Sequence, residues 1–216
     1  LNLVLYGRAK RPSCQKVLRR ADEDDNEILD SLRDPANADM WQLFDQRYRP
    51  VIHAFGLQRG LTDSDAAEVA QTTLAQFTAD YSLGRYDRSR GRLSSWILGI
   101  ASHRIADIGR AKQRHRRDRG ESAFEQLASA SSPEECWQAA LRKIILERAL
   151  RALREETRLD ERTVRAFELC SLRGVPVGAV AAECLMTVDE VYVAKNRAIK
   201  KLREIVERFE HEFEED

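Results

Sequence analysis

Residues 84–119 read GRYDRSRGRLSSWILGIASHRIADIGRAKQRHRRDR. Eleven Arg and Lys side chains in this stretch stand against three Asp, which gives 11 − 3 = +8, although the whole chain has a formal net charge of zero. Apolar residues recur three and four positions apart from Leu93 to Ile108, which predicts a helix with one buried face and one basic face. A polar, Gly-containing loop from Leu83 to Arg92 precedes it. This concentration of charge favours a polyphosphate partner, although a solvated Arg-rich helix end would explain it as well.

The composition predicts a soluble, helix-rich protein. Charged residues make up 33% and hydrophobic residues 43% of the 216 residues, with few Gly and Pro. No apolar run approaches the roughly 20 residues that a membrane-spanning helix needs, so we expect no membrane insertion. The opening LNLVLY is too short for the apolar part of a signal peptide. The four cysteines form no C-x-x-C pair and have no His at metal-ligand spacing, which indicates a reducing cytoplasm and no metal site.

Changes of composition divide the chain into five parts. Residues 1–24 switch from basic to acidic without periodicity, which predicts a disordered tail. Residues 25–119 form a first helical domain, and the Ser- and Ala-rich residues 120–132 form a flexible linker. Residues 133–209 form a second helical domain. The acidic residues 210–216 are most simply a solvated helix end.

Helices of the first domain follow from apolar spacing and cap signals. A helix is expected over residues 25–35, and an aromatic stripe predicts a second helix that Pro50 kinks or splits. Thr62 and Asp65 resemble a capping box at the start of the next helix. The polar face of that helix is either wet surface or a docking surface for another protein, and periodicity does not choose between them. Its members are Asp65, Glu68, Gln71 and Thr72.

The second domain carries the spacing of a helix-turn-helix. Ser132-Pro133-Glu134-Glu135 predicts a helix start, and further helices are expected over Thr163–Arg173 and Val177–Cys184. Leu185-Met186 forms a tight turn, and a capping box from Thr187 to Glu190 opens a long last helix. Any helical hairpin can mimic this pattern. The last helix, however, carries side chains that reach major-groove edges and phosphates: Tyr192, Lys195, Asn196, Arg197, Lys200 and Lys201.

Four segments in this order resemble a known family. They are LFDQRYRPVIHAF at 43–55, DSDAAEVAQTTLAQF at 63–77, YDRSRGRLSSWILGIASHRIADIGR at 86–110, and GVPVGAVAAECLMTVDEVYVAKNRAIKKLRE at 174–204. Together they resemble the extracytoplasmic-function (ECF) sigma factors of bacterial RNA polymerase, over about residues 38–119 and 136–206. The third segment is the longest and most specific match. The chain departs from the pattern at Ala179, where the family has an acidic residue, and at Leu185, where it has the turn Gly. A left-handed Leu costs about 1 kcal/mol relative to Gly.

The resemblance implies an all-α fold of two small helical domains joined by a flexible linker, the second a helix-turn-helix. The first, similar to sigma region 2, would bind core RNA polymerase and recognise and melt the −10 element of promoter DNA. The second, similar to sigma region 4, would read the −35 element. Implied contacts near −10 are Arg85, Tyr86, Asp87, Arg90, Arg92, Trp96, His103, Arg104, Asp107, Arg110, Lys112 and Arg114. Implied contacts at −35 are Thr187, Val188, Asp189, Glu190, Tyr192, Val193, Lys195, Asn196, Arg197 and Lys200. Implied polymerase contacts are Asp65, Glu68, Gln71 and Thr72.

The resemblance further implies how the first domain works. The helix at Asp65–Asp80 would clasp a coiled coil of the large polymerase subunit. The loop at Leu83–Arg92 would hold a flipped base, while the basic end of the following helix makes phosphate contacts that carry no sequence information. An anti-sigma factor is a further partner that the resemblance allows.

Two alternatives remain. A helix-turn-helix transcriptional regulator would bind DNA through the second domain alone, without replacing the sigma factor. An enzyme is the other, but the four His lie in unrelated contexts. The sequence also holds no H-E-x-x-H, nucleophile elbow or phosphate-binding Gly loop, so we expect neither catalysis nor a cofactor.

Overall fold

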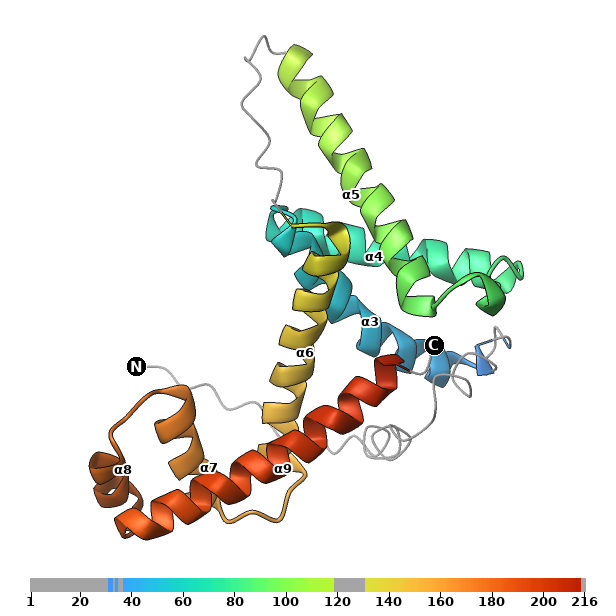
Figure 1. Ribbon diagram of the computed structural model, residues 1–216. Helices are drawn as coiled ribbons and strands as arrows, with labels where there is room; N and C mark the ends of the chain where they lie inside the picture. The colour runs from blue at the N-terminus through green and yellow to red at the C-terminus, as the bar shows by residue number, and fades with distance from the viewer. Residues whose placement is uncertain (1–30, 33, 35–36, 119–130, 215–216) are drawn as a thin grey trace, which may run out of the picture.

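The computed structural model describes residues 31–32, 34, 37–118 and 131–214. All regular secondary structure within these ranges is helical, which confirms the all-α class. The elements are α3 (Ala38–Gln58), α4 (Asp63–Ser82), the 3-10 turn η1 (Arg88–Arg90), α5 (Leu93–Asp118), α6 (Pro133–Glu155), α7 (Glu161–Phe167), the π-helical segment η2 (Glu168–Leu172), α8 (Val177–Cys184) and α9 (Val188–Glu214) (Figure 1). The predicted tail at 1–24, most of the predicted helix at 25–35 and all but the end of the predicted linker lie outside the described residues.

Helices α3 and α4 form the centre of the first half through an aromatic core. The rings of Phe44 and Phe77 stack with centroids 4.5 Å apart. α3 runs unbroken through Pro50, so of the two expected outcomes, a kink or a split, the split does not occur. Gly56 lets the two helices approach closely, because a Cβ atom there would lie only 3.0 Å from the Cβ atom of Ala66.

Helix α5 packs on this core chiefly through its first half, and Ile108 continues the contact. Leu93, Ile97 and Ala101 are buried, as the apolar spacing predicts. Beyond them the helix extends away from α3 and α6 (Figure 1). Of the later side chains that the structure describes, Asp107, Arg110 and Arg114 are exposed.

Helices that precede residue 119 and helices that follow residue 130 share one core. Phe55 of α3 meets Trp137 of α6 edge to face, with centroids 5.7 Å apart. Tyr48 of α3 meets Phe213, near the end of α9, at 5.5 Å. α6 and the second half of α9 thus belong to the same apolar cluster as α3, α4 and α5.

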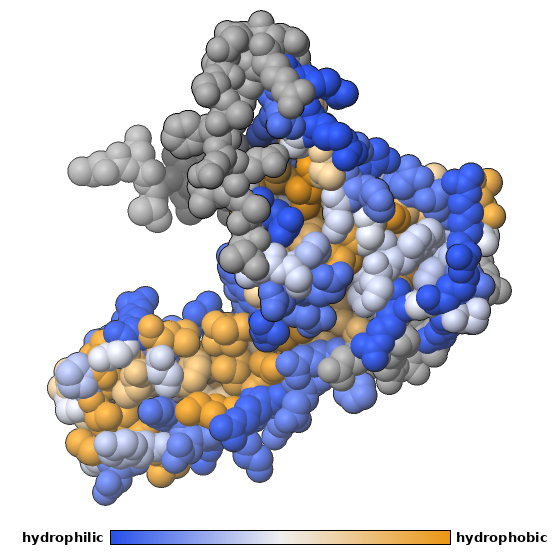
Figure 2. Space-filling view, turned by 45° about the horizontal axis from the view of Figure 1, so that its top comes forward, coloured by the Kyte–Doolittle hydropathy of each residue, from blue (hydrophilic) through white to orange (hydrophobic). Residues whose placement is uncertain are grey.

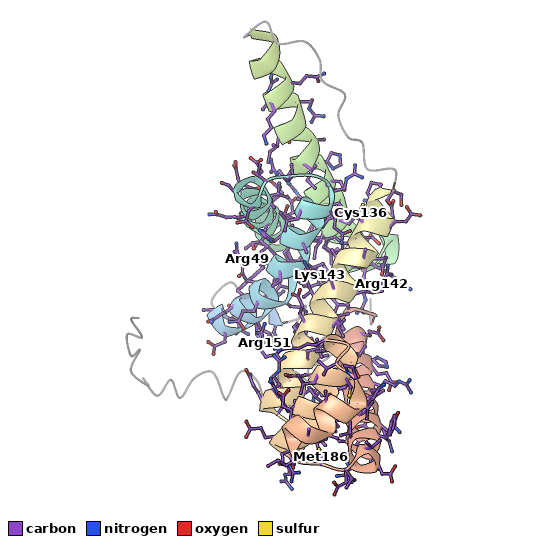
Figure 3. The ribbon with its side chains drawn as sticks, turned by 90° about the vertical axis from the view of Figure 1, so that its left-hand side faces the viewer. Arg49, Cys136, Arg142, Lys143, Arg151 and Met186 are labelled. Atoms are coloured by element: carbon purple, nitrogen blue, oxygen red, sulfur yellow. The ribbon has the colours of Figure 1, made fainter. Side chains whose placement is uncertain are left out.

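A second, smaller cluster joins α7, η2, α8 and the beginning of α9. Its buried members are Ala166, Leu169, Val180, Ala181, Cys184, Val191 and Ala194. Figure 3 shows α6 running from Cys136, beside the first-half helices, towards the lobe that Met186 marks. The helix-turn-helix is therefore a lobe at one end of a helical frame.

The interpretation of the chain end as a solvated helix end is wrong at two residues. Glu212 and Phe213 are only 8% and 5% exposed. The Arg47 guanidinium donates a hydrogen bond of 3.1 Å to the Glu212 carbonyl oxygen, and the Arg148 guanidinium lies 3.0 Å from the Glu212 carboxylate. Two arginines from other helices thus hold the acidic end of α9 in place.

Candidate nucleic-acid interface

The loop between α4 and α5 is a compact, hydrogen-bonded turn. A carboxylate oxygen of Asp87 accepts hydrogen bonds from the backbone N–H of Ser89 at 3.0 Å and from its hydroxyl at 2.7 Å. These bonds hold the pKa of Asp87 below its usual value. Gly84 and Gly91, at φ 68° and 153°, take the backbone into and out of the turn. Asp87 therefore shapes the loop from within.

Three arginines project from this turn. Arg88, Arg90 and Arg92 are all exposed. Arg88 is absent from the residues that the resemblance implies, although the Asp87 cap followed by a 3-10 turn presents it beside Arg90. The alternation of Arg with small residues in DRSRGR is the signal that could have included it.

Aromatic rings support the loop from below. Tyr86 stacks on Trp96, with centroids 5.1 Å apart and planes 19° apart, and Trp96 meets Phe77 of the core at 5.3 Å. Trp96 is only partly exposed. Tyr86 covers one face of the Trp96 ring, and we call this partly exposed stack of two predicted contact residues the aromatic floor of the loop.

A chain of side-chain hydrogen bonds, called the polar relay below, links the beginning of the loop to α5. Arg104 donates to the Gln76 side-chain oxygen at 3.0 Å, and the Gln76 amide donates to Asp80 at 2.8 Å. Arg85 donates to the other Asp80 oxygen at 2.6 Å. The hydrogen bond from Gln76, followed by that from Arg85, lowers the pKa of Asp80. Arg85 and Arg104, two predicted DNA contacts, therefore also hold the loop in position.

The outer part of α5 carries the remaining predicted contacts. Asp107 and Arg110 form an exposed ion pair of 2.5 Å, in which the carboxylate partly neutralises the field of the guanidinium. The exposed His103 ring contacts the Gly99 carbonyl at 2.7 Å through Nδ1. Arg114 is exposed. Of these predicted contacts, Arg110 is therefore paired within α5.

One pair joins residues predicted for two different partners. Lys112 of α5 donates a hydrogen bond to Asp65 of α4, and with the Thr62 hydroxyl it lowers the pKa of Asp65. The Thr62 hydroxyl also accepts a hydrogen bond from the Asp65 backbone N–H at 3.2 Å, as an N-cap does. The polar groups of Asp65 are thus engaged by Lys112 and Thr62, whereas Glu68 and Gln71 of the same helix are exposed.

Thr72 takes part in helix hydrogen bonding. Its hydroxyl donates to the Glu68 carbonyl oxygen at 2.8 Å. Of the four predicted polymerase contacts, Glu68 and Gln71 therefore offer the most accessible polar groups on α4.

The turn of the helix-turn-helix takes a strained conformation that other groups stabilise. Leu185 is left-handed, with φ 53° and ψ 49°, as expected for a position where Gly is usual. The Arg162 guanidinium donates to the carbonyl oxygens of Cys184, at 2.9 Å, and Leu185. Because Arg162 lies 23 residues before this turn, the sequence offered no local signal for its role.

The predicted capping box at the start of α9 is confirmed. The Thr187 backbone N–H donates to the Glu190 carboxylate at 2.7 Å, and the Glu190 backbone N–H donates to the Thr187 hydroxyl at 3.2 Å. These bonds lower the pKa of Glu190. Thr187 and Glu190, both predicted DNA contacts, are engaged in the cap.

The remaining predicted −35 contacts lie on the outer side of α9. Val191, Ala194 and Ala198 are buried against the rest of the molecule, which sets the orientation of the helix. The exposed side then presents Val188, Asp189, Tyr192, Val193, Asn196, Arg197 and Lys200, with Lys195 partly exposed at its flank. The loop and this face lie at opposite ends of the molecule (Figure 1).

Neither a metal site nor a membrane span was found in the parts of the chain that the structure describes. No three His, Cys, Asp or Glu side chains there gather so that they could hold a metal ion. No described helix is both long and apolar enough to cross a bilayer. The sequence matches no protein-family model and no curated protein.

Proposed function

We propose that this chain is an RNA polymerase sigma factor of the ECF type, which directs core polymerase to promoters with −10 and −35 elements and starts transcription. The observation that carries the proposal is the arrangement of two separate surfaces of nucleic-acid-binding type on one helical frame. One is the outer face of α9, and the other is the arginine-bearing loop over an aromatic floor.

In this proposal α9 reads the −35 element in the major groove. Amide, guanidinium and ammonium side chains match base edges and phosphates, and Asn196, Arg197 and Lys200 supply one of each on the exposed side. Phosphate contacts set the register, while base-edge contacts carry the specificity.

The loop at the other end captures a base of the −10 element. Extruding a base costs a few kcal/mol, which stacking and backbone neutralisation offset. The Tyr86–Trp96 floor offers a stacking partner, and Arg88, Arg90 and Arg92 offer cations for the backbone. The exposed polar face of α4 around Glu68 and Gln71 is the proposed polymerase contact.

The proposal places the protein in the cytoplasm, with promoter DNA and core polymerase as partners and an anti-sigma factor as a candidate regulator. The chain itself catalyses no reaction and needs no cofactor. It acts by positioning polymerase and stabilising opened DNA.

Transcription in vitro tests the proposal directly. Purified chain is added to core RNA polymerase and genomic promoter fragments, and specific start sites are mapped. Arg197→Ala should weaken promoter use without changing polymerase binding, and Glu68→Ala with Gln71→Ala should weaken polymerase binding. Glu207→Ala, which removes an exposed carboxylate elsewhere, serves as control. Failure of the wild-type chain to support any initiation would refute the proposal.

A transcriptional regulator without polymerase-directing activity is the second candidate. The exposure of the α9 face favours it, because no described part of the chain covers the residues that would contact DNA. Such a regulator would bind duplex DNA alone and would leave initiation dependent on another sigma factor. The same transcription assay, with and without a resident sigma factor, separates the two functions.

A further inference from the structure

Large apolar side chains gather on the outside of the helix-turn-helix. Eight such side chains are exposed in the described part of the chain, and four of them lie at the turn and the start of α9. Their exposed fractions are 84% for Leu185, 46% for Val188, 50% for Tyr192 and 57% for Val193. Figure 2 shows apolar side chains reaching the surface of the lobe that α7, α8 and the start of α9 form. Single exposed apolar residues are ordinary, but a group of four indicates a binding surface.

These four side chains lie outside the apolar cluster of the lobe. The inner side of α9 already packs through Val191, Ala194 and Ala198. Tyr192 and Val193 are each at least half exposed, and neither belongs to the apolar cluster of this lobe. These side chains are therefore available to contact a binding partner.

Polar groups of a particular kind surround the apolar ones. In an α-helix, residues three and four apart lie on the same side, so Val193, Asn196 and Lys200 follow one another along the exposed face. Tyr192 and Arg197 flank that row at adjacent positions. An amide and two cations around a small apolar centre complement the edges and phosphates of a DNA duplex.

The small apolar centre matches one feature of the major groove. The only apolar group that a base pair presents there is the C5 methyl group of thymine, and Asn pairs with the N6 and N7 edge of adenine. Val193 and Asn196 are about 4.5 Å apart along the helix axis, which is close to one base-pair step of about 3.4 Å. Neighbouring A·T pairs fit this spacing.

From this geometry we infer that α9 reads a thymine through its methyl group with Val193, flanked by Tyr192, while Asn196 reads an adenine one step away. The inference rests on the proposed reading of promoter DNA by α9, and it adds the class of sequence that is read. Arg197 and Lys200 then bind the phosphates or guanines beside this step.

Duplexes that carry deoxyuridine test the inference, because uracil lacks only the methyl group of thymine. The full-length chain, bound to core RNA polymerase, first selects its preferred site from a random duplex library. Each thymine of that site is then replaced singly by deoxyuridine, and the affinity is measured by competition. At one or two positions we expect binding about fourfold weaker, the effect of losing one buried methyl group.

Val193→Ala should bind the thymine duplex about fourfold more weakly and should no longer distinguish thymine from uracil. Leu172→Ala is the matched control, since Leu172 is 49% exposed but lies at the end of η2, and it should discriminate as the wild type does. Wild-type indifference to every uracil replacement would overturn the inference, as would discrimination that persists in Val193→Ala. If Val193→Ala weakens polymerase binding instead, the face is a protein contact and the inference is wrong.

The two proposals fail in different ways. If initiation on the selected site is normal and uracil has no effect, the thymine reading is wrong and the sigma function stands. If the chain supports no initiation at all, the sigma function is wrong, whatever uracil does to binding.

Discussion

We expect Glu212 to contribute more to the stability of the protein than an exposed glutamate of an acidic chain end would, because the end of α9 packs against α3 and α6. Its carboxylate lies 3.0 Å from the Arg148 guanidinium and 3.7 Å from Nε of Arg47, and Arg47 is only 3% exposed. Breaking a buried ion pair by removing one partner costs about 3–5 kcal/mol, because the other charge stays buried. Arg47 keeps its hydrogen bond to the Glu212 carbonyl oxygen, and Arg148 is partly exposed. We therefore expect Glu212→Ala to lose about 2–4 kcal/mol, below the top of that range.

Urea unfolding of wild type, Glu212→Ala and Glu210→Ala measures this loss. Glu210 lies in the same turn but is exposed, so its removal should change the free energy of unfolding by less than about 0.5 kcal/mol. Arg148→Met, alone and with Glu212→Ala, completes a double-mutant cycle with an expected coupling of about 1–3 kcal/mol. Equal stability of the Glu212→Ala and Glu210→Ala variants would show that the end of α9 does not dock on α3 and α6. The reasoning would also fail if the coupling were zero.

Four further substitutions test separate parts of the structure by the same unfolding measurement. Gly56→Val should destabilise the protein by about 3 kcal/mol, because the new side chain would meet the backbone of α4. Gly99→Ala, with open space around it, should instead stabilise the protein by up to about 1 kcal/mol. An unchanged stability of Gly56→Val would contradict the close approach of α3 and α4. Leu185→Gly should stabilise by about 1 kcal/mol by relieving the left-handed Leu, and a loss of stability would show that this exposed side chain has a packing role. The pKa of Glu190 is lowered in the folded protein, chiefly by the hydrogen bond from the Thr187 backbone N–H. This interaction stabilises the protein above the pKa of Glu190 in the unfolded chain, near 4.5, and the stabilisation is lost as the pH falls through the lower pKa of the folded state. The urea concentration at the midpoint of unfolding should therefore fall less for Glu190→Gln than for the wild type between pH 6 and pH 3. An identical fall in both proteins would show that the ionisation of Glu190 does not contribute to stability.

Local signals predicted the local structure well. The predicted Ser132 cap and the predicted capping box at Thr187 are present, and α8 has the predicted bounds. The left-handed Leu185 follows from the comparison with a Gly-bearing turn. Each of these features depends on residues within about four positions of one another, so the sequence itself displays the interacting groups.

The candidate interfaces were only partly predictable. The residue types on the outer face of α9 follow from its spacing, because its apolar side chains mark which side is buried. The pairing of Asp65 with Lys112 does not, since the two lie 47 residues apart and both read as exposed charges. The same holds for the relay from Arg104 through Gln76 to Asp80, which links helices that only the packing of α5 on α4 brings together.

The sequence by itself determined the all-α class, the helix caps and the side chains that the basic helix and the last helix carry. The tertiary structure alone decided where the acidic end of α9 lies. Acidic side chains are unfavourable at a helix C-terminus, so local rules predicted a solvated end there. Arg47, 165 residues earlier, and Arg148 reverse that expectation, because they bring positive charge to the end of α9 while Phe209 and Phe213 bury it in the shared core.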